Sequence, residues 1–328
     1  MAIWCHPMLK FINAQLPEWA RPDHPILQYE LAHLQHVESR QARFFQLLVI
    51  ALILGMGGYL YATTIYVPPT QSNLTDLAWR ILYFPTLLVQ ILTSTLALSF
   101  GINSVGRQRS NHTWDNLRAT EIGAELTLRT RWVGILYRLR APIIAILLVR
   151  LLLVIGVLYD ITAFGGLYPE MLTKNLTPMI GDAKLGLVVL AFNMTAGMLL
   201  PITMICASAG IGILISVGIK NRAYSAILQV IITVAQLVLT IGILTTISQF
   251  LLGQLELSNT ALLALFVGYS SFGDWGLLFL QLGSVGEIWA IVPYGIFIGI
   301  GLVVLMLVQS AVTDGILSLA VKLSESRE

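Results

Sequence analysis

The sequence predicts an all-α integral membrane protein with six transmembrane helices, and three observations lead to this prediction. Hydrophobic residues make up 56% of the 328 residues, whereas charged residues make up only 11%. Several apolar runs are longer than the roughly 20 residues that a helix needs to cross the hydrocarbon core of a bilayer. Lysines and arginines gather in alternate segments between these runs. One membrane-embedded bundle therefore fits the chain better than two water-soluble domains.

The six predicted spans are apolar runs bounded by polar segments, and they form one transmembrane domain over residues 44–320. The fourth span contains Pro201 and is long enough to tilt or kink. A cytoplasmic loop at 103–140 joins the second and third spans, and a cytoplasmic tail follows at 321–328. The spans cover residues 44–67, 77–102, 141–159, 185–217, 223–250 and 290–312.

Basic residues predict the orientation, because basic loops are translocated poorly. Most of the 19 lysines and arginines fall in four places: before the first span, after the second, in the turn after the fourth, and in the tail. The predicted outer loops contain only Lys174 and Lys184. Both termini are therefore expected in the cytoplasm, and the protein is expected in the cytoplasmic (inner) membrane.

Residues 1–43 are expected to be retained as cytoplasmic interfacial helices. They carry prolines and charges before any apolar run, unlike a cleaved signal peptide. Two similar stretches, HPMLKFINAQL and HPILQYELAHL, each place a proline where a helix can begin. In the second stretch Leu27 and its apolar neighbours share one side, which is typical of a helix lying in the membrane interface. A simple amphipathic anchor and a surface for a partner both fit this pattern.

The connection at 251–289 has no lysine or arginine but contains two short apolar stretches, ALLALF and WGLLFLQL. Each follows residues that can cap the start of a helix. Both stretches are too short to cross a bilayer. Re-entrant or surface helices on the outer face are therefore expected between the fifth and sixth spans.

No motif for catalysis or for a cofactor occurs in the chain. It has no G-x-x-x-x-G-K-[ST] loop for nucleotide phosphates, no H-E-x-x-H or C-x-x-C pair, and no histidine beyond His112. The two cysteines, Cys5 and Cys206, are not expected to pair. We therefore expect no enzymatic activity, no metal site, no bound cofactor and no nucleic-acid partner.

Arg150 is the most conspicuous residue within a span, because it stands near the middle of the third. An arginine at that depth costs roughly 2.5 to 3.5 kcal/mol on insertion scales, so it is expected to face protein, backbone carbonyls or a wet cavity. One interpretation is structural, with the guanidinium bonded to carbonyls freed near Pro201 or Pro85. The other is contact with an anionic substrate or a lipid headgroup.

Polar and small residues on the last two spans are suited to helix contacts. Gln229 and Gln236, each followed by a threonine four residues later, line one face of the fifth span. Hydrogen bonds between helices explain this face, and so does a substrate path on which the two glutamines contact the substrate. In the sixth span Gly295 and Gly299 form G-x-x-x-G, which permits close helix packing.

The polar stretch NHTWDNLRATEIGAEL lies between the second and third spans. Its first residues can start a helix, on which Trp114, Leu117 and Arg118 share one face. Tryptophan and arginine supply much of the binding energy at protein interfaces, so a partner-binding helix fits. A solvated loop with an interfacial tryptophan fits the pattern as well. The candidate partner-binding residues are Thr113, Trp114, Asp115, Leu117, Arg118 and Thr120.

At several places the sequence resembles the membrane subunits, or permeases, of type-2 ATP-binding-cassette (ABC) transporters, which are largely exporters. HPILQYEL is similar to the N-P-x-L-x-x-E-L with which these subunits open. The stretch after the second span is similar to the family's coupling helix, T-W/L-x-x-L-x-x-T, with Thr113, Trp114, Leu117 and Thr120 at the matching positions. The turn ASAGIGILISVGIKNRAYS and the two short helices before the sixth span are also similar.

The resemblance implies a permease that is driven by ATPase subunits on separate chains. It implies that the coupling helix docks in a groove of the ATPase subunit, and that a second permease, identical or different, completes the path across the membrane. Membrane lipid is the remaining expected partner. The alternative is a non-transporting accessory subunit that stabilises a larger membrane protein complex.

Overall fold

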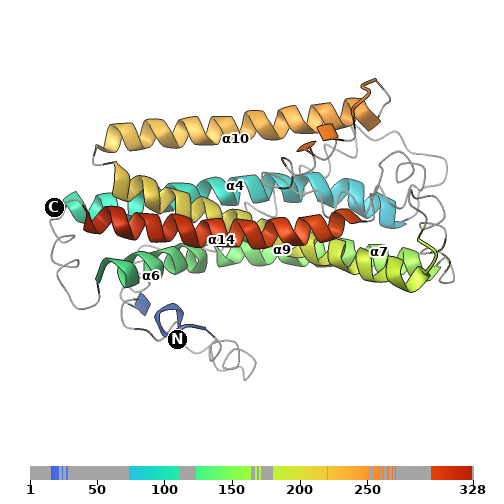
Figure 1. The fold of residues 1–328 in the computed structure, drawn as a ribbon, viewed down its shortest axis with the longest axis horizontal. Helices are drawn as coiled ribbons and strands as arrows, with labels where there is room; N and C mark the ends of the chain where they lie inside the picture. The colour runs from blue at the N-terminus through green and yellow to red at the C-terminus, as the bar shows by residue number, and fades with distance from the viewer. Residues whose placement is uncertain are drawn as a thin grey trace.

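The computed structural model is all-helical in the part of the chain that it describes, and that part contains no strand. Its elements are η1 (Glu18–Ala20), α4 (Leu74–Ser110), α6 (Gly123–Arg138), α7 (Arg140–Ala163), α9 (Ala183–Gly218), α10 (Arg222–Leu251) and α14 (Ile298–Glu325) (Figure 1). The described residues are 16–21, 24, 27–28, 74–110, 123–163, 167, 170, 180–219, 221–251, 254–258, 260–261, 264–265, 268, 270 and 297–326.

Five of the described helices, α4, α7, α9, α10 and α14, are long and apolar enough to cross a membrane. The all-α class is thus confirmed, and the helices suit a membrane protein. The predicted first span, 44–67, lies outside the described residues, as do most of the N-terminal segment and most of the connection at 251–289. The count of six spans and the cytoplasmic termini therefore stay predictions.

The predicted limits of the third to fifth spans fall within a few residues of those of α7, α9 and α10. The α4 helix, in contrast, continues to Ser110, past the predicted end of the second span at 102 and into the predicted loop at 103–140. The last helix differs, because α14 continues to Glu325, well past residue 312 and into the predicted tail. Its added turns bury Leu317 and Ala320 against the bundle. Apolar contact therefore extends the helix beyond the run that the sequence marks as a span.

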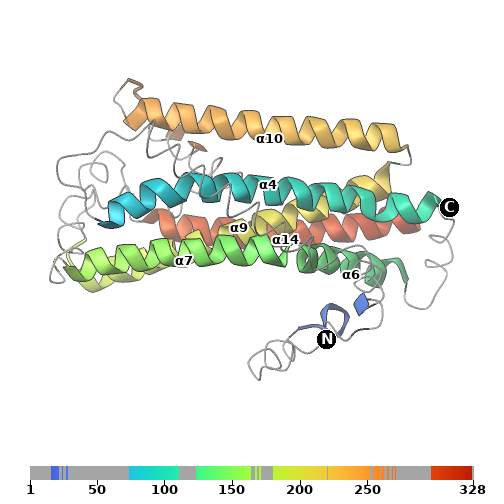
Figure 2. The same ribbon diagram turned by 180° about the vertical axis from the view of Figure 1, so that it is seen from behind.

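The helices α4 and α9 run in the same direction. Ser94 Oγ lies 2.6 Å from Ser208 Oγ, and further along both helices the Val105 N–H donates to Ser216 Oγ at 3.0 Å. Figures 1 and 2 show α14 running the same way, whereas α7 and α10 return in the opposite direction. This alternation is what successive crossings of one bilayer produce.

The packed centre of the bundle is apolar and, among the described helices, draws on α4, α6, α7, α9 and α14. Its fully or nearly fully buried side chains come from α4, α6, α7, α9 and α14, with one example from each being Val89, Leu128, Ile146, Ile205 and Leu317. The α9 helix packs against α4, α6, α7 and α14, so it is the central helix among those described.

The α6 and α7 helices form one nearly continuous rod, with a turn at Leu139 between them. The backbone ladder persists across the turn, since the Leu139 N–H donates to Ile135 O at 3.1 Å and the Ile143 N–H donates to Leu139 O at 3.0 Å. Pro142 has no N–H for the carbonyl of Arg138, four residues earlier, which accounts for the break. The two helices are therefore joined by backbone hydrogen bonds across the turn.

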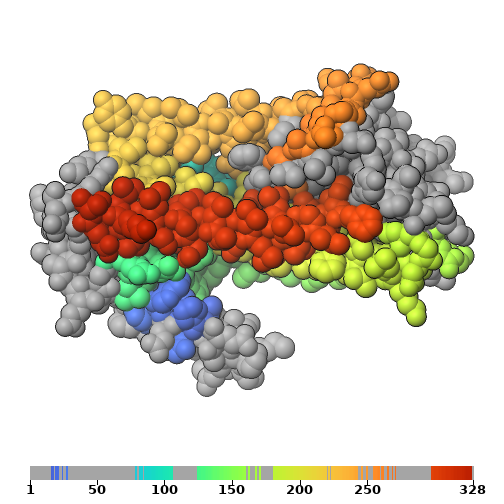
Figure 3. Space-filling model, in the orientation of Figure 1, coloured from blue at the N-terminus to red at the C-terminus, as the bar shows by residue number. Residues whose placement is uncertain are grey.

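The α10 helix lies at the edge of the bundle, and most of its side chains are exposed apolar residues (Figures 1 and 2). The start of α10, the C-terminal end of α14 and all of α6 lie at one end of the molecule, which we call the α6 end. Figure 3 shows that α14 is exposed along the front face of the molecule and that the η1 segment lies against α6. These apolar outer faces suit contact with lipid.

Candidate functional site

The predicted coupling helix lies outside the described residues. Thr113, Trp114, Asp115, Leu117, Arg118 and Thr120 all fall between the last residue of α4 and the first residue of α6. The structure therefore fixes only where the segment leaves and rejoins the bundle, which is at the α6 end (Figure 1). The role of these six residues stays a prediction.

The α6 helix, which follows this segment directly, is anchored to the transmembrane helices by polar contacts. The Arg131 guanidinium is buried and donates through Nη1 to Ser104 O of α4 at 3.3 Å. The Trp132 indole donates through Nε1 to Cys206 O of α9 at 2.9 Å. Both acceptors are backbone carbonyls, so α6 is attached to the backbones of α4 and α9 rather than to side chains that can rotate.

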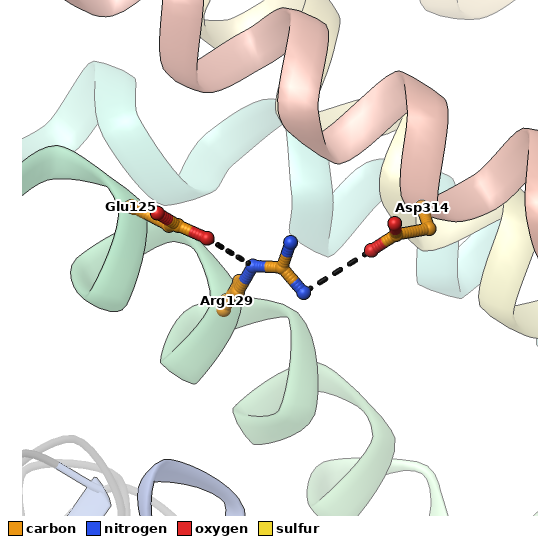
Figure 4. A network of polar contacts seen from close by, with 3 residues as sticks. All are labelled: Glu125, Arg129 and Asp314. Carbon is orange, nitrogen blue, oxygen red and sulfur yellow. Dashed lines mark ion pairs between the residues drawn. The ribbon is translucent and has the colours of Figure 1, made fainter.

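Arg129 joins α6 to α14 (Figure 4). Its Nη1 lies 3.1 Å from Asp314 Oδ1, and its Nε lies 3.0 Å from Glu125 Oε1 one turn earlier on α6. Arg129 Nε has no hydrogen-bond partner among the described residues, so its contact with Glu125 is a charge contact only. The Arg129 side chain is 24% exposed and that of Asp314 is 63% exposed, so water and salt weaken the pair.

The described residues of the N-terminal segment pack against α6. Arg129 Cζ lies 6.0 Å from the ring centre of Trp19, within the range of a cation–π contact. The Tyr137 hydroxyl donates to Ala20 O at 3.4 Å, and Leu27 is fully buried in a cluster with Val133. At least this part of the predicted interfacial helix therefore rests on the protein itself.

Arg150 lies inside the bundle with 1% of its surface exposed. Its Nη1 donates to the backbone carbonyl of Gly197 on α9, and its Nη2 donates to Gln90 Oε1 of α4 at 2.5 Å. Gln90 in turn donates through Nε2 to the sulfur of Met204 at 3.5 Å. The guanidinium thus connects α7, α4 and α9 at the middle of the membrane-spanning region.

The contact with Gly197 is the one that the structural interpretation of Arg150 predicted. A proline at 201 has no N–H, so it leaves the carbonyl four residues earlier, at Gly197, without its helical donor. Arg150 supplies a donor from another helix. Contact between Arg150 and a substrate or a lipid headgroup stays a prediction.

Asn193 is a functional candidate that the sequence did not single out. It is 1% exposed, and neither its Oδ1 nor its Nδ2 has a hydrogen-bond partner in the described part of the chain. Gly299 of α14 fits against it, since a Cβ atom added at Gly299 would lie 2.6 Å from Asn193 N. The close packing expected of Gly299 is therefore present, whereas Gly295 lies outside the described residues.

The polar face of the fifth span is the more buried side of α10. Gln236 and Thr240 are buried and Gln229 is half-buried, while the neighbouring apolar residues of α10 are exposed. Thr240 Oγ1 donates to Gln236 O within the same helix at 2.8 Å. Gln229 and Gln236 are not joined to Arg150 by any hydrogen bond among the described residues, so a shared substrate path stays a prediction.

Among the described residues, no group of three or more His, Cys, Asp or Glu could hold a metal ion, and Cys206 is a free cysteine. Comparison with known proteins adds no relative: no protein-family model, no curated protein and no solved structure matches the chain.

Proposed function

We propose that the chain is the membrane-spanning permease subunit of an ABC transporter of the exporter type, driven by ATPase subunits on separate chains. The observation that best supports this function is the anchoring of α6 to α4, α9 and α14, directly after the segment 111–122. A segment that receives force from a partner is useful only if the helix behind it is firmly attached to the spans.

In the proposed mechanism, ATP binding brings the ATPase subunits together and moves the segment that contains Trp114. Because α6 and α7 form one rod, the movement passes from α6 to the span that carries Arg150. A ligand or partner shifts a conformational equilibrium only by contacting the two states differently. The docked ATPase provides that difference at 111–122, and a second permease subunit completes the path.

Purification of the tagged chain from its native membranes in a mild detergent tests this function. We expect an ATPase chain with a phosphate-binding loop to co-purify, and we expect Trp114→Ala to reduce its recovery. Tyr224→Ala is the matched control, because Tyr224 is an exposed aromatic residue at the same end of the molecule and lies outside the segment. Recovery of unrelated membrane proteins without any ATPase would instead identify an accessory subunit.

A further inference from the structure

The α9 helix has a built-in gap in its hydrogen bonding. In an α-helix each N–H donates to the carbonyl four residues earlier, and Pro201 has no N–H to give to Gly197. Away from water, an unsatisfied carbonyl is costly. Arg150 fills the gap from α7, and both the guanidinium and the bond are buried. The continuity of α9 at this point therefore depends on a side chain of a different helix.

Gln90 orients the guanidinium that fills the gap. Its Oε1 accepts from Arg150 Nη2 at 2.5 Å, and its own Nε2 is placed against Met204, on the far side of Pro201 from Gly197. The polar contacts of Arg150 and Gln90 thus reach α9 on both sides of the proline. Such contacts would limit bending of α9 at Pro201.

A second acceptor lies one turn away on α9. Asn193 precedes Gly197 by four residues, so the two lie on neighbouring positions of the same helix face. Buried amide groups are nearly always hydrogen-bonded in proteins, yet both polar atoms of this side chain lack a partner within the described residues. Its Oδ1 is therefore a ready acceptor for a buried donor.

We propose that Arg150 is a two-position latch on α9. In the first position its guanidinium replaces the N–H that Pro201 lacks and holds α9 firm; in the second it moves to Asn193 Oδ1, which leaves Gly197 O without a donor and frees α9 to bend at Pro201. Asn193 and Gly197 are one helical turn apart along α9, and one-turn shifts of about 5.4 Å are a known step in conformational switches. The latch concerns the helices alone and goes beyond the proposed function.

A double-mutant cycle tests the first position. Arg150→Met removes the donor, whereas Pro201→Ala restores a backbone N–H to Gly197. We expect Arg150→Met to lower the midpoint of thermal unfolding in detergent, and we expect this drop to be at least halved in the Pro201→Ala background. Arg150→Lys, which keeps the charge for correct insertion, should show a smaller drop with the same dependence on residue 201.

Thr203→Val is the matched control for this cycle. Thr203 lies close to Pro201, but the partners of its Oγ1 are Gln309 Oε1 at 2.8 Å and Leu200 O at 2.9 Å rather than Gly197 O. Its effect should be equal in both backgrounds. If Arg150→Met and Arg150→Lys also cost the same in both backgrounds, Arg150 does not replace the proline's missing donor, and the proposal is overturned.

Distances between spin labels test the second position. The labels would be placed at Val188 and Gly218, which lie before and after Pro201 in α9. The labelled chain would have its native cysteines replaced by alanine and would be reconstituted in lipid vesicles. We expect two distance populations, of which Asn193→Leu removes the minor one, because the second acceptor is gone. A distribution that is identical with and without Asn193→Leu would overturn the second position.

Discussion

Gly101 and Gly212 meet backbone to backbone where α4 crosses α9. A Cβ atom added at Gly101 would lie 2.8 Å from Gly212 Cα, and one added at Gly212 would lie 2.9 Å from Gly101 Cα and 2.5 Å from Leu98 O. Real Cβ atoms do not approach other atoms so closely. The two glycines therefore set the separation of the two helices, and they allow the hydrogen bonds on either side of the crossing to form.

Gly212→Ala is expected to destabilise the protein by roughly 1–3 kcal/mol, the usual cost of overpacking a tight core. The obstructing atoms belong to the α4 backbone, so no side-chain rotation relieves the clash. Thermal unfolding in detergent measures the effect. Gly218→Ala is the control in the same helix, because nothing lies within 4 Å of a Cβ added there. Equal stability of the two variants would contradict the described crossing.

Gly299→Ala is expected to push α14 away from α9 and lower the unfolding midpoint. The new methyl group would lie 2.6 Å from Asn193 N and 2.9 Å from its Cα, both backbone atoms of a packed helix. Gly301→Ala, two residues further along α14, provides the comparison, since its Cβ would point into open space. A loss of stability in Gly301→Ala as large as in Gly299→Ala would show that helix packing is not the cause.

Local patterns were enough to predict the class of the fold and one internal contact. Long apolar runs place α7, α9 and α10 within a few residues of their observed limits. The cost of burying a charge predicted that Arg150 would bond to carbonyls freed near a proline, and Gly197 is such a carbonyl. Both inferences depend on transfer free energies of side chains within one helix, namely the gain from burying an apolar run and the cost of burying the Arg150 charge.

Contacts that depend on helix register could not be predicted in this way. Nothing in the sequence near Gly101 indicates that Gly212 faces it, because the pairing is set by how the whole surfaces of α4 and α9 fit. The same holds for Arg129 and Asp314, which lie far apart along the chain. Asn193 was missed because the sequence does not show whether a single amide within an apolar run is buried, or whether it has a hydrogen-bond partner.

The Arg129–Asp314 pair is expected to add little to stability. Pairs this exposed are worth about 0.2–1 kcal/mol, and salt reduces that value. A double-mutant cycle with Arg129→Gln and Asp314→Asn, measured at low and high salt, gives the coupling free energy. Glu125→Gln is the control for loss of a nearby carboxylate that leaves the link to α14 intact. A coupling well above 1 kcal/mol that salt does not change would contradict the exposure of this pair.

Trp114→Ala and Arg118→Ala are expected to uncouple ATP hydrolysis from transport while leaving the spans inserted. The truncated side chains would no longer hold the segment against its proposed partner, so ATP would be hydrolysed without moving α6. Assays of both activities in vesicles that contain the complete complex give the ratio. Lys322→Ala is the control and should leave the ratio unchanged, because Lys322 is an exposed residue in the last turn of α14, at the α6 end of the molecule. Normal coupling in both test variants would reject the assigned role.

Site-specific photo-cross-linking from position 114 in native membranes identifies the molecule that the proposed coupling helix contacts. With a photoreactive amino acid in place of Trp114, mass spectrometry identifies the chain that is captured. We expect an ATPase with a phosphate-binding loop to be captured, at the groove in which the coupling helix is proposed to dock. Capture of lipid alone, or of this chain alone, in the working assembly would contradict the proposed docking.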